Sequence, residues 1–385
     1  MQPSLELAPL DRCSFGRKAV GTTIAEVLDS PTLKQQIRDA LDEHGVLLFP
    51  GQQLDPEQEA AFAKLFPWDD SVSMLTECAG PFATAQSTGV VGAGAANIDR
   101  WKLPALPMVQ CQGDGPVRDH HGVPDGELSA SQTFAEWHTD GVHDTPRTTQ
   151  PPVATTMYCL ATPACGGETL FASARAGFEA LPEALQQRAR GLTAVFDGRF
   201  RPMVPGGTRA QQPVSGGSGG GGGGDWAETR RFPLVARDGR GREGLYGVAP
   251  AFTRCLLEAD GTALGEEEGQ ALLDQILHHA LRLPADGRAP PHDGQVPIVE
   301  TANLYAHRWA AGDLVVWDNR TMLHSASPSP RYKGRGTRLF HRVRMSSRVP
   351  VTPAFSAGFG VLKGENHRTQ ATSATSSAQP WCRPK

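Results

Sequence analysis

The chain has 385 residues, of which 39% are hydrophobic and 20% are charged, and its formal net charge is −4. This composition is typical of a globular protein and excludes a wholly disordered chain. The negative charge argues against a nucleic-acid binder that relies on a broad basic surface. The length exceeds that of most single domains but suits one decorated β fold.

The cysteines and the N-terminus predict a location in the cell. The seven cysteines are scattered, their number is odd, and no Cys-x-x-Cys occurs, which favours free thiols in a reducing compartment. Residues 1–9 contain no apolar run fit for a signal peptide, and no stretch approaches the roughly 20 apolar residues of a spanning helix. We therefore expect a cytoplasmic protein without a membrane or nucleic-acid partner, and a short organelle-targeting peptide stays open as an alternative.

The N-terminal part predicts a helix, a strand and a second helix. Leu33, Ile37 and Leu41 recur at helical spacing, and Gly45 stands where a glycine often ends a helix. Residues 46–49 are apolar and predict a short buried strand. Asp55 followed by Pro56 predicts the start of the next helix.

The remaining elements predict a mainly β fold with flanking helices. Residues 71–135 are rich in Gly, Pro and Asp, which indicates long loops with short strands. The patterns predict strands at 151–160, 168–172 and 313–317, and helices at 181–192 and 266–283. Short strands bounded by turns fit a jelly-roll-like core. We expect one domain over 1–365, with a flexible Gly/Ser-rich insertion at about 207–225 and a disordered tail at 366–385.

One short motif suggests a metal site. Residues 136–141 read Glu-Trp-His-Thr-Asp-Gly, and in a strand the side chains of His138 and Asp140 would point to the same face. His324, which follows the apolar segment 313–320, is the candidate third ligand. Two histidines and one carboxylate on one face of an octahedral ion leave three positions open, as in non-haem Fe(II) oxygenases.

Other interpretations of these residues remain open on the pattern alone. His-x-Asp is common by chance, so Asp140 could cap a turn and His138 could be a core histidine. His143 competes as a ligand because it lies close to His138. His278 and His279 lie in a predicted helix, where neighbours point about 100° apart and do not easily share an ion. The pair His120 and His121 lies in a predicted loop and could flank a pocket.

Five ordered segments resemble the taurine dioxygenase and 2,4-dichlorophenoxyacetate dioxygenase family of Fe(II)- and 2-oxoglutarate-dependent oxygenases. They are HGVLLFPGQQLDPEQEAAFAKLFP (44–67), EWHTDG (136–141), PPVATTMYCLATPACGGETLFAS (151–173), HRWAAGDLVVWDNRTMLHSASPS (307–329) and TRLFHRVRM (337–345). The resemblance implies a double-stranded β-helix (jelly-roll, cupin-like) core. It also implies that His138, Asp140 and His324 bind Fe(II).

The same resemblance implies a 2-oxoglutarate site. Arg338 falls at the family position that binds the distal carboxylate of 2-oxoglutarate, and Thr169 falls at the position whose hydroxyl assists it. An arginine suits this task because its planar fork can grip a carboxylate with two hydrogen bonds. Without the motif, Arg338 would be read as a surface arginine and Thr169 as an ordinary strand residue.

Arg342 resembles the family arginine that meets an anionic group on the substrate, although a surface salt bridge is an alternative role. Taurine dioxygenases also use an upstream histidine for the sulfonate, and residues 89–112 contain none. Taurine itself is therefore in doubt, and we expect a small sulfonate or carboxylate.

The resemblance implies hydroxylation of a small molecule with O2 consumed and succinate and CO2 formed. The intact carboxylate of Asp140 favours hydroxylation, desaturation or cleavage over halogenation. Family members are often dimers or larger, so a homo-oligomer is open. The alternatives are a zinc-dependent hydrolase and a non-catalytic jelly-roll binding protein, and neither gives Arg338 and Thr169 a role.

Overall fold

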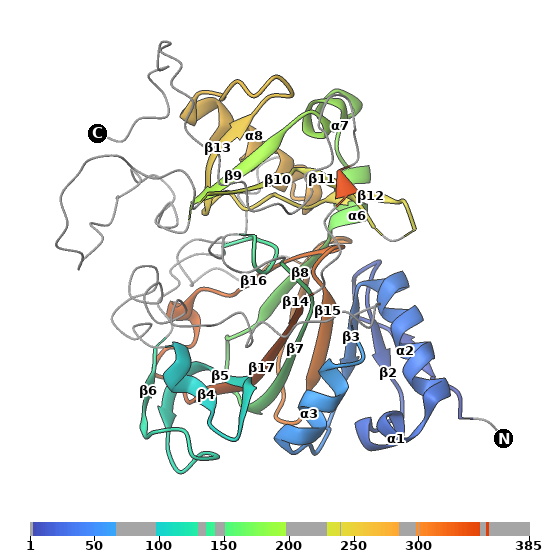
Figure 1. Ribbon diagram of the computed structural model, residues 1–385, viewed down its shortest axis with the longest axis vertical. Helices are drawn as coiled ribbons and strands as arrows, with labels where there is room; N and C mark the ends of the chain where they lie inside the picture. Colours follow the sequence, from blue (N-terminus) through green and yellow to red (C-terminus); the bar gives the residue numbers. More distant parts are fainter. Residues whose placement is uncertain are drawn as a thin grey trace, which may run out of the picture.

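A computed structural model of the chain describes residues 3–66, 98–129, 136–142, 151–197, 229–238, 240–284, 298, 300–346 and 352–353. The Gly/Ser-rich insertion at 207–225, the C-terminal tail at 366–385 and His143 lie outside these ranges. In the described ranges, strands outnumber helices, which confirms the expected mainly β fold with flanking helices (Figure 1).

A nine-stranded sheet forms the lower half of the molecule in Figure 1. Its order is β1-β2-β3-β15-β7-β17-β5-β4, and β6 pairs with β5. Most neighbouring strands are antiparallel, and β2 and β3 are parallel. The strands are β1 (Leu7–Pro9), β2 (Arg17–Ala19), β3 (Val46–Phe49), β4 (Lys102–Leu103), β5 (Leu106–Val117), β6 (Gly126–Leu128), β7 (Pro152–Ala161), β15 (Leu314–Asp318) and β17 (Arg338–Ser346).

A three-stranded sheet packs against the centre of the large sheet. It consists of β14 (Tyr305–His307), β8 (Thr169–Ser173) and β16 (Met322–Ala326), with β8 in the middle. Phe171 of β8 and Met322 of β16 share one apolar cluster with Met157, Trp317 and Phe340 of the large sheet. The rings of Phe171 and Trp317 meet edge to face with centroids 5.4 Å apart. Burial of these side chains between the two sheets holds the sheets together.

Helices cover the outer face of the large sheet. They are α1 (Ile24–Asp29), α2 (Pro31–His44) and α3 (Pro56–Ala63). The predicted ends are confirmed: Gly45 ends α2 with a φ of 75°, and the Asp55 side chain accepts a hydrogen bond from the backbone N–H of Gln58. Leu33, Ile37 and Leu41 are buried, as their spacing predicts.

Within the described ranges, two small sheets and three helices surround a separate apolar cluster in the upper half of Figure 1. The order is β10-β9-β13 in one sheet and β12-β11-β18 in the other. The elements are α6 (Ala174–Glu179), α7 (Glu183–Arg190), β9 (Thr193–Asp197), β10 (Thr229–Pro233), β11 (Val235–Arg237), β12 (Glu243–Leu245), β13 (Thr253–Leu257), α8 (Glu266–Ala280) and β18 (Thr352–Pro353). Two 3-10 turns complete the described elements, Ile98–Trp101 and Ser329–Arg331.

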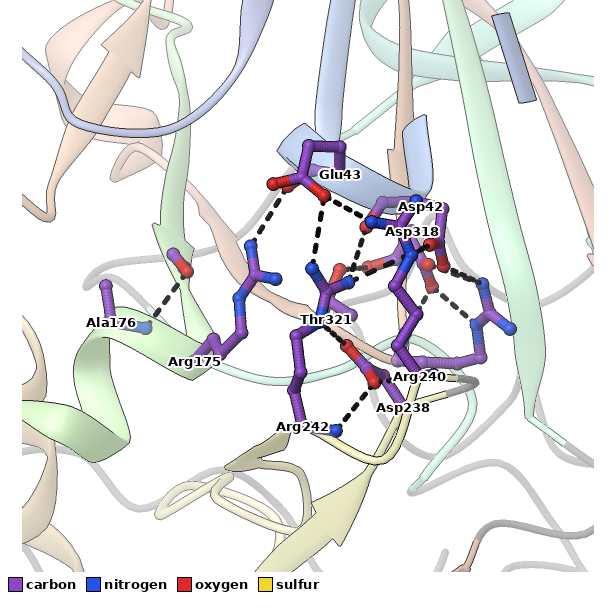
Figure 2. A network of polar contacts seen from close by, with 11 residues as sticks. Asp42, Glu43, Arg175, Ala176, Asp238, Arg240, Arg242, Asp318 and Thr321 are labelled. Carbon is purple, nitrogen blue, oxygen red and sulfur yellow. Dashed lines mark hydrogen bonds and ion pairs between the residues drawn. The ribbon is translucent and has the colours of Figure 1, made fainter. Parts of the chain in front are cut away.

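An ionic network joins the two halves (Figure 2). Arg240 and Arg242, in the turn between β11 and β12, bind Asp42 and Glu43 at the end of α2. The Arg242 Nε atom lies 2.7 Å from Asp238 Oδ2, so an ion pair also links the two ends of this turn. Elements far apart in the sequence are therefore fixed to each other by charge pairs.

One expectation about the middle of the chain is wrong in part. Residues 71–135 read as loops with short strands, but β5 spans 12 residues. Gly113 is one reason that the pattern misleads, because β17 passes so close that a Cβ at this position would collide with the Arg338 carbonyl oxygen. Gly113 suggests a loop in the sequence, but it is required because two strands pack closely at this position.

Two further observations concern the expected location. The cysteines in the described ranges, Cys13, Cys111, Cys159, Cys165 and Cys255, are all free thiols, as predicted. None of the helices in those ranges combines the length and apolarity that crossing a membrane requires.

Candidate metal centre and anion site

His138 and His324 are joined through their backbones. The N–H of His138 donates to the His324 carbonyl oxygen at 3.0 Å, and the N–H of His324 donates back at 2.9 Å. His324 belongs to β16, whereas His138 makes only this isolated bridge. Residues 136–140 thus form no strand beyond this bridge. A long-range bridge, rather than strand alternation, places the first histidine.

Asp140 lies in the turn that follows. Its Oδ1 atom is 4.0 Å from His138 Nε2 and 3.7 Å from His324 Nε2. Gly141 has a φ of 78°, and it turns the chain immediately after the carboxylate. One ligand atom from each of the three residues lies within 4.8 Å of the others. The structure therefore brings together the three ligands that the sequence suggests.

Contacts around the histidine rings orient them. His138 Nδ1 lies 2.5 Å from the Glu136 carbonyl oxygen, so this nitrogen carries the proton and Nε2 presents its lone pair. The ring of His324 packs against Trp317, with centroids 5.0 Å apart. The two histidine rings are 4.4 Å apart. Both Nε2 atoms face the Asp140 carboxylate.

A chain of hydrogen bonds holds the Asp140 carboxylate. The Thr155 hydroxyl donates to Asp140 Oδ2 at 2.6 Å, and it accepts from Asn319 Nδ2 at 2.9 Å. The Trp317 indole N–H donates to Asn319 Oδ1 at 2.9 Å. Oδ2 is thereby engaged, and Oδ1 is left facing the two histidines.

Sequence reasoning missed Thr155 and Asn319. Each is a polar residue in or next to a segment whose pattern predicts an apolar buried strand. A polar residue in such a segment is the signal that could have indicated a role at the site.

The electrostatic surroundings keep Asp140 ionised. Burial by itself would raise the pKa of this carboxyl, but His324, Arg342, Arg344 and His138 lower it and outweigh burial. Two imidazole nitrogens and one carboxylate oxygen are a donor set that non-haem iron accepts. The residues present therefore fit a divalent metal ion.

Arg338 is a buried cation. It is 5% exposed, and its guanidinium lies 4.4 Å from the centre of the Phe340 ring and 5.6 Å from that of Tyr332. Its Nε–H donates to the Gly167 carbonyl oxygen at 3.0 Å. Burial lowers the pKa of Arg338. Within the described ranges no carboxylate forms an ion pair with it. A buried charge is costly without a partner, so this guanidinium is suited to hold an anion.

Thr169 lies in the same region. Its hydroxyl oxygen accepts a hydrogen bond from the Trp309 indole N–H at 3.0 Å. The Trp309 ring also packs on Phe340, with centroids 4.7 Å apart, and Phe340 carries Arg338 on its face. Because Trp309 uses an acceptor position of Thr169, the hydroxyl hydrogen can still be donated.

Arg342 shares the inward face of β17 with Arg338. Side chains alternate along a strand, and Phe340, which stands between these arginines, is buried between the two sheets. Arg342 Nη2 donates to Gln110 Oε1 at 3.1 Å, and its charge lowers the pKa of Asp140. Arg342 is therefore directed toward the carboxylate side of the site.

The paired histidines that the sequence also offered as candidates lie elsewhere. His278 and His279 are in α8, as expected. His120 lies against His341 on the face of the large sheet that is opposite Phe340.

Comparison with known proteins identifies the family. The model of the taurine catabolism dioxygenase TauD, TfdA family matches residues 6–344. The alpha-ketoglutarate-dependent 2,4-dichlorophenoxyacetate dioxygenase of Cupriavidus pinatubonensis is 27% identical over 310 residues, which cover 78% of this chain and 85% of that protein. The alpha-ketoglutarate-dependent sulfate ester dioxygenase of Pseudomonas putida is 24% identical, with 88% of both chains covered.

A solved structure agrees in fold. The crystal structure of a taurine dioxygenase from Burkholderia xenovorans superposes with a TM-score of 0.57 at 22% identity, over 91% of this chain and 92% of that chain. The expected resemblance is thus confirmed along most of the described chain. The protein belongs to the taurine catabolism dioxygenase TauD, TfdA family.

Proposed function

We propose that this dioxygenase hydroxylates a small organic anion, with Fe(II) held by His138, Asp140 and His324 and with 2-oxoglutarate and O2 as co-substrates. Succinate and CO2 are the coproducts. The observation that carries the proposal is the position of Arg338. This buried guanidinium, which has no carboxylate partner in the described ranges, belongs to the same two-sheet core as the two histidines and the aspartate.

The metal ligands define what the chain contributes to the reaction. When bound, iron would supply the oxygen chemistry, with three of its positions left open by the protein ligands. His138 and His324 would contribute imidazole nitrogens, and Asp140 would contribute one negative charge. Thr155 holds the far oxygen of Asp140, so the near oxygen keeps its orientation.

Arg338 and Thr169 would bind the distal carboxylate of 2-oxoglutarate. The guanidinium supplies charge and a planar pair of donors, and the Thr169 hydroxyl supplies a further donor. Trp309 and Phe340 pack around both residues and exclude water. A hydrogen bond between charged groups is stronger in such a dry environment than at the surface.

Arg342 would bind the anionic group of the substrate. It lies on the same face of β17 as Arg338, four residues further along the strand, and it lowers the pKa of Asp140. The names of two relatives specify a carboxylate substrate and a sulfate ester, which supports an anionic substrate class. Residues 89–112 contain no histidine, so taurine is not the favoured candidate.

The fold supports the same assignment. We propose that the large sheet and the β14-β8-β16 sheet are the two faces of a double-stranded β-helix, with the metal ligands at one end of the space between them. The two sheets share one apolar cluster, and His324 lies on a strand of the small sheet.

The test is a screen of small carboxylates, sulfonates and sulfate esters with Fe(II), 2-oxoglutarate and O2, in which succinate release and product formation are both measured. At least one anion should give product in equal amount to succinate. His324→Ala should lose one equivalent of bound Fe(II) and release no succinate, while its circular dichroism stays that of the native chain. Turnover without O2 or 2-oxoglutarate would instead support a hydrolase.

A further inference from the structure

A second cluster of metal-ligating side chains lies on the outer face of the large sheet. His341 of β17 points away from Phe340 and Arg338, toward helix α3. Cys111 of β5 stands beside it, directly opposite in the strand register. His120, from the turn that follows β5, completes the group. One ligand atom from each of these three residues lies within 4.8 Å of the others.

The contacts within this cluster are short and buried. His120 Nε2 and His341 Nε2 are 2.7 Å apart. The other ring nitrogen of His341 lies 2.8 Å from Glu59 Oε1. Cys111 and His341 are each 1% exposed, and Glu59, on α3, is 2% exposed. Glu59, whose pKa is raised by burial to about 9, therefore brings a carboxyl group from an otherwise apolar helix face to a histidine that is fully enclosed.

We propose that Cys111, His120 and His341 bind a divalent ion of the zinc class, and that Glu59 orients His341 from behind. One thiolate and two imidazoles are a borderline-soft donor set, which zinc prefers and which differs from the His/His/Asp set of the iron centre. A histidine that binds metal through one nitrogen commonly donates its other N–H to a carboxylate. Glu59 stands in this position.

The geometry requires one small movement. Two imidazoles that bind zinc at 2.0–2.1 Å in a tetrahedral arrangement place their nitrogens about 3.3 Å apart, compared with the present 2.7 Å. His341 is held in a strand, but His120 is partly exposed and lies in a turn. His120 is thus the side chain that can move outward. Its neighbours Asp119 and His121 have positive φ values of 43° and 45°, so the backbone conformation is unusual on both sides of His120.

The protonation states are compatible with binding. Burial, together with the neighbouring histidines, lowers the pKa of His341 to about 3 and that of His120 to about 4. Both rings are therefore neutral at neutral pH, which is the form that binds metal. Burial raises the pKa of Cys111 to about 12, so the ion must displace the thiol proton.

The site would stabilise the strand that carries the proposed anion-binding arginines. The three ligands join β5, β17 and the turn after β5, and Glu59 connects them to α3. Arg338 and Arg342 lie on the other face of the same stretch of β17. An ion in this cluster would therefore fix the position of these arginines without contact with the iron centre.

The test uses the full chain with His324→Ala, which removes the iron centre, and Co(II) as the probe after chelator treatment. We expect one equivalent of Co(II) bound with a sulfur-to-cobalt charge-transfer band in the near ultraviolet. Cys111→Ser should abolish the band. His120→Ala should weaken Co(II) binding at least tenfold. The chain with His324 intact should bind two equivalents.

Two matched controls sharpen the result. His121→Ala removes the adjacent histidine, and Cys159→Ser removes a buried thiol from the opposite face of the sheet. Both variants should keep the band and the stoichiometry. If His324→Ala binds no Co(II), or if the band survives Cys111→Ser, the proposal is wrong and the cluster is only a hydrogen-bonded relay. If Cys111→Ser fails to fold, the amount of Co(II) bound by His120→Ala is compared with the amount bound by His121→Ala, and this comparison decides.

Discussion

At the scale of single residues, two arginines on the inward face of β17, Arg338 and Arg342, have separable tasks. Arg338 is enclosed by aromatic rings, whereas Arg342 reaches Gln110 and influences Asp140. A charge-assisted contact to a carboxylate contributes about 1.5–3 kcal/mol. We expect Arg338→Ala to raise the KM for 2-oxoglutarate by roughly ten- to a hundredfold. The charge-transfer band of the anaerobic Fe(II)–2-oxoglutarate complex should weaken in parallel.

Arg342→Ala is the matched variant. It should leave that band almost unchanged, lose affinity for the anionic substrate, and release succinate without product. The reverse pattern, with the band lost only in Arg342→Ala, would mean that the two roles must be exchanged. An unchanged KM for 2-oxoglutarate in both variants would remove the cationic support for the cosubstrate site.

Thr155 is a positioning residue for the metal centre. Its hydroxyl donates a hydrogen bond to Asp140 Oδ2, and Asn319 in turn fixes that hydroxyl. Thr155→Val should weaken anaerobic Fe(II) binding by about ten- to a hundredfold, because the carboxylate is free to rotate. Thr155→Ser keeps the hydroxyl and should restore affinity. Thr156→Val, at the next buried position of β7, should change Fe(II) affinity less than twofold.

At the scale of elements, the turn between β11 and β12 is held by charge. The Asp238 side chain is 3% exposed and accepts from the Arg242 side chain as well as from backbone N–H groups of Arg240 and Arg242. Asp238→Asn should lower the free energy of unfolding by about 1.5–3 kcal/mol at neutral pH, measured by urea denaturation. Asp260→Asn, in a turn without an ion pair in the described ranges, should have a smaller effect.

The carboxylates of Asp238 and Glu43 predict that the folded protein loses stability in acid. Burial tends to raise the pKa of Asp238, but its backbone and Arg242 partners lower it below the ordinary value of 3.8. Arg242 and Arg240 likewise outweigh burial and lower the pKa of Glu43 below 4.5. The unfolded chain therefore takes up protons first as the pH falls through these values, and stability decreases. Asp238→Asn should show a shallower loss of stability below pH 3.8 than the native chain, and an equal slope would contradict the assignment.

At the scale of the whole molecule, the sequence predicts a dispensable insertion. Residues 219–224 are all glycine and belong to the insertion at about 207–225, which lies outside the described residues. Twofold shortening of a flexible loop changes its closure entropy by only about 0.6 kcal/mol. Deletion of Gly219 to Gly224 should leave Tm and turnover nearly unchanged. A large loss of turnover at normal Tm would instead indicate that the segment acts at the active site.

Local features of the fold were predictable because they depend on neighbouring residues. Asp55 and Gly45 cap helices through contacts that span a few positions, and the spacing of Leu33, Ile37 and Leu41 defines a buried face within one helix. The twelve residues of β5 were not predictable in this way. That strand exists because β17 pairs with it, and its glycines allow the close approach.

The sequence by itself determined the metal-ligand types and the family, since these reside in short ordered motifs. Only the tertiary structure decided how the ligands meet. His138 reaches His324 through a backbone bridge between distant segments. Thr155 of β7 reaches Asp140, and Asn319, which directly follows the neighbouring strand β15, reaches Thr155. It also decided that His120 meets His341 and Cys111. Contacts of this kind depend on strand order and register in the sheet, which follow from burial across the whole core rather than from any local pattern.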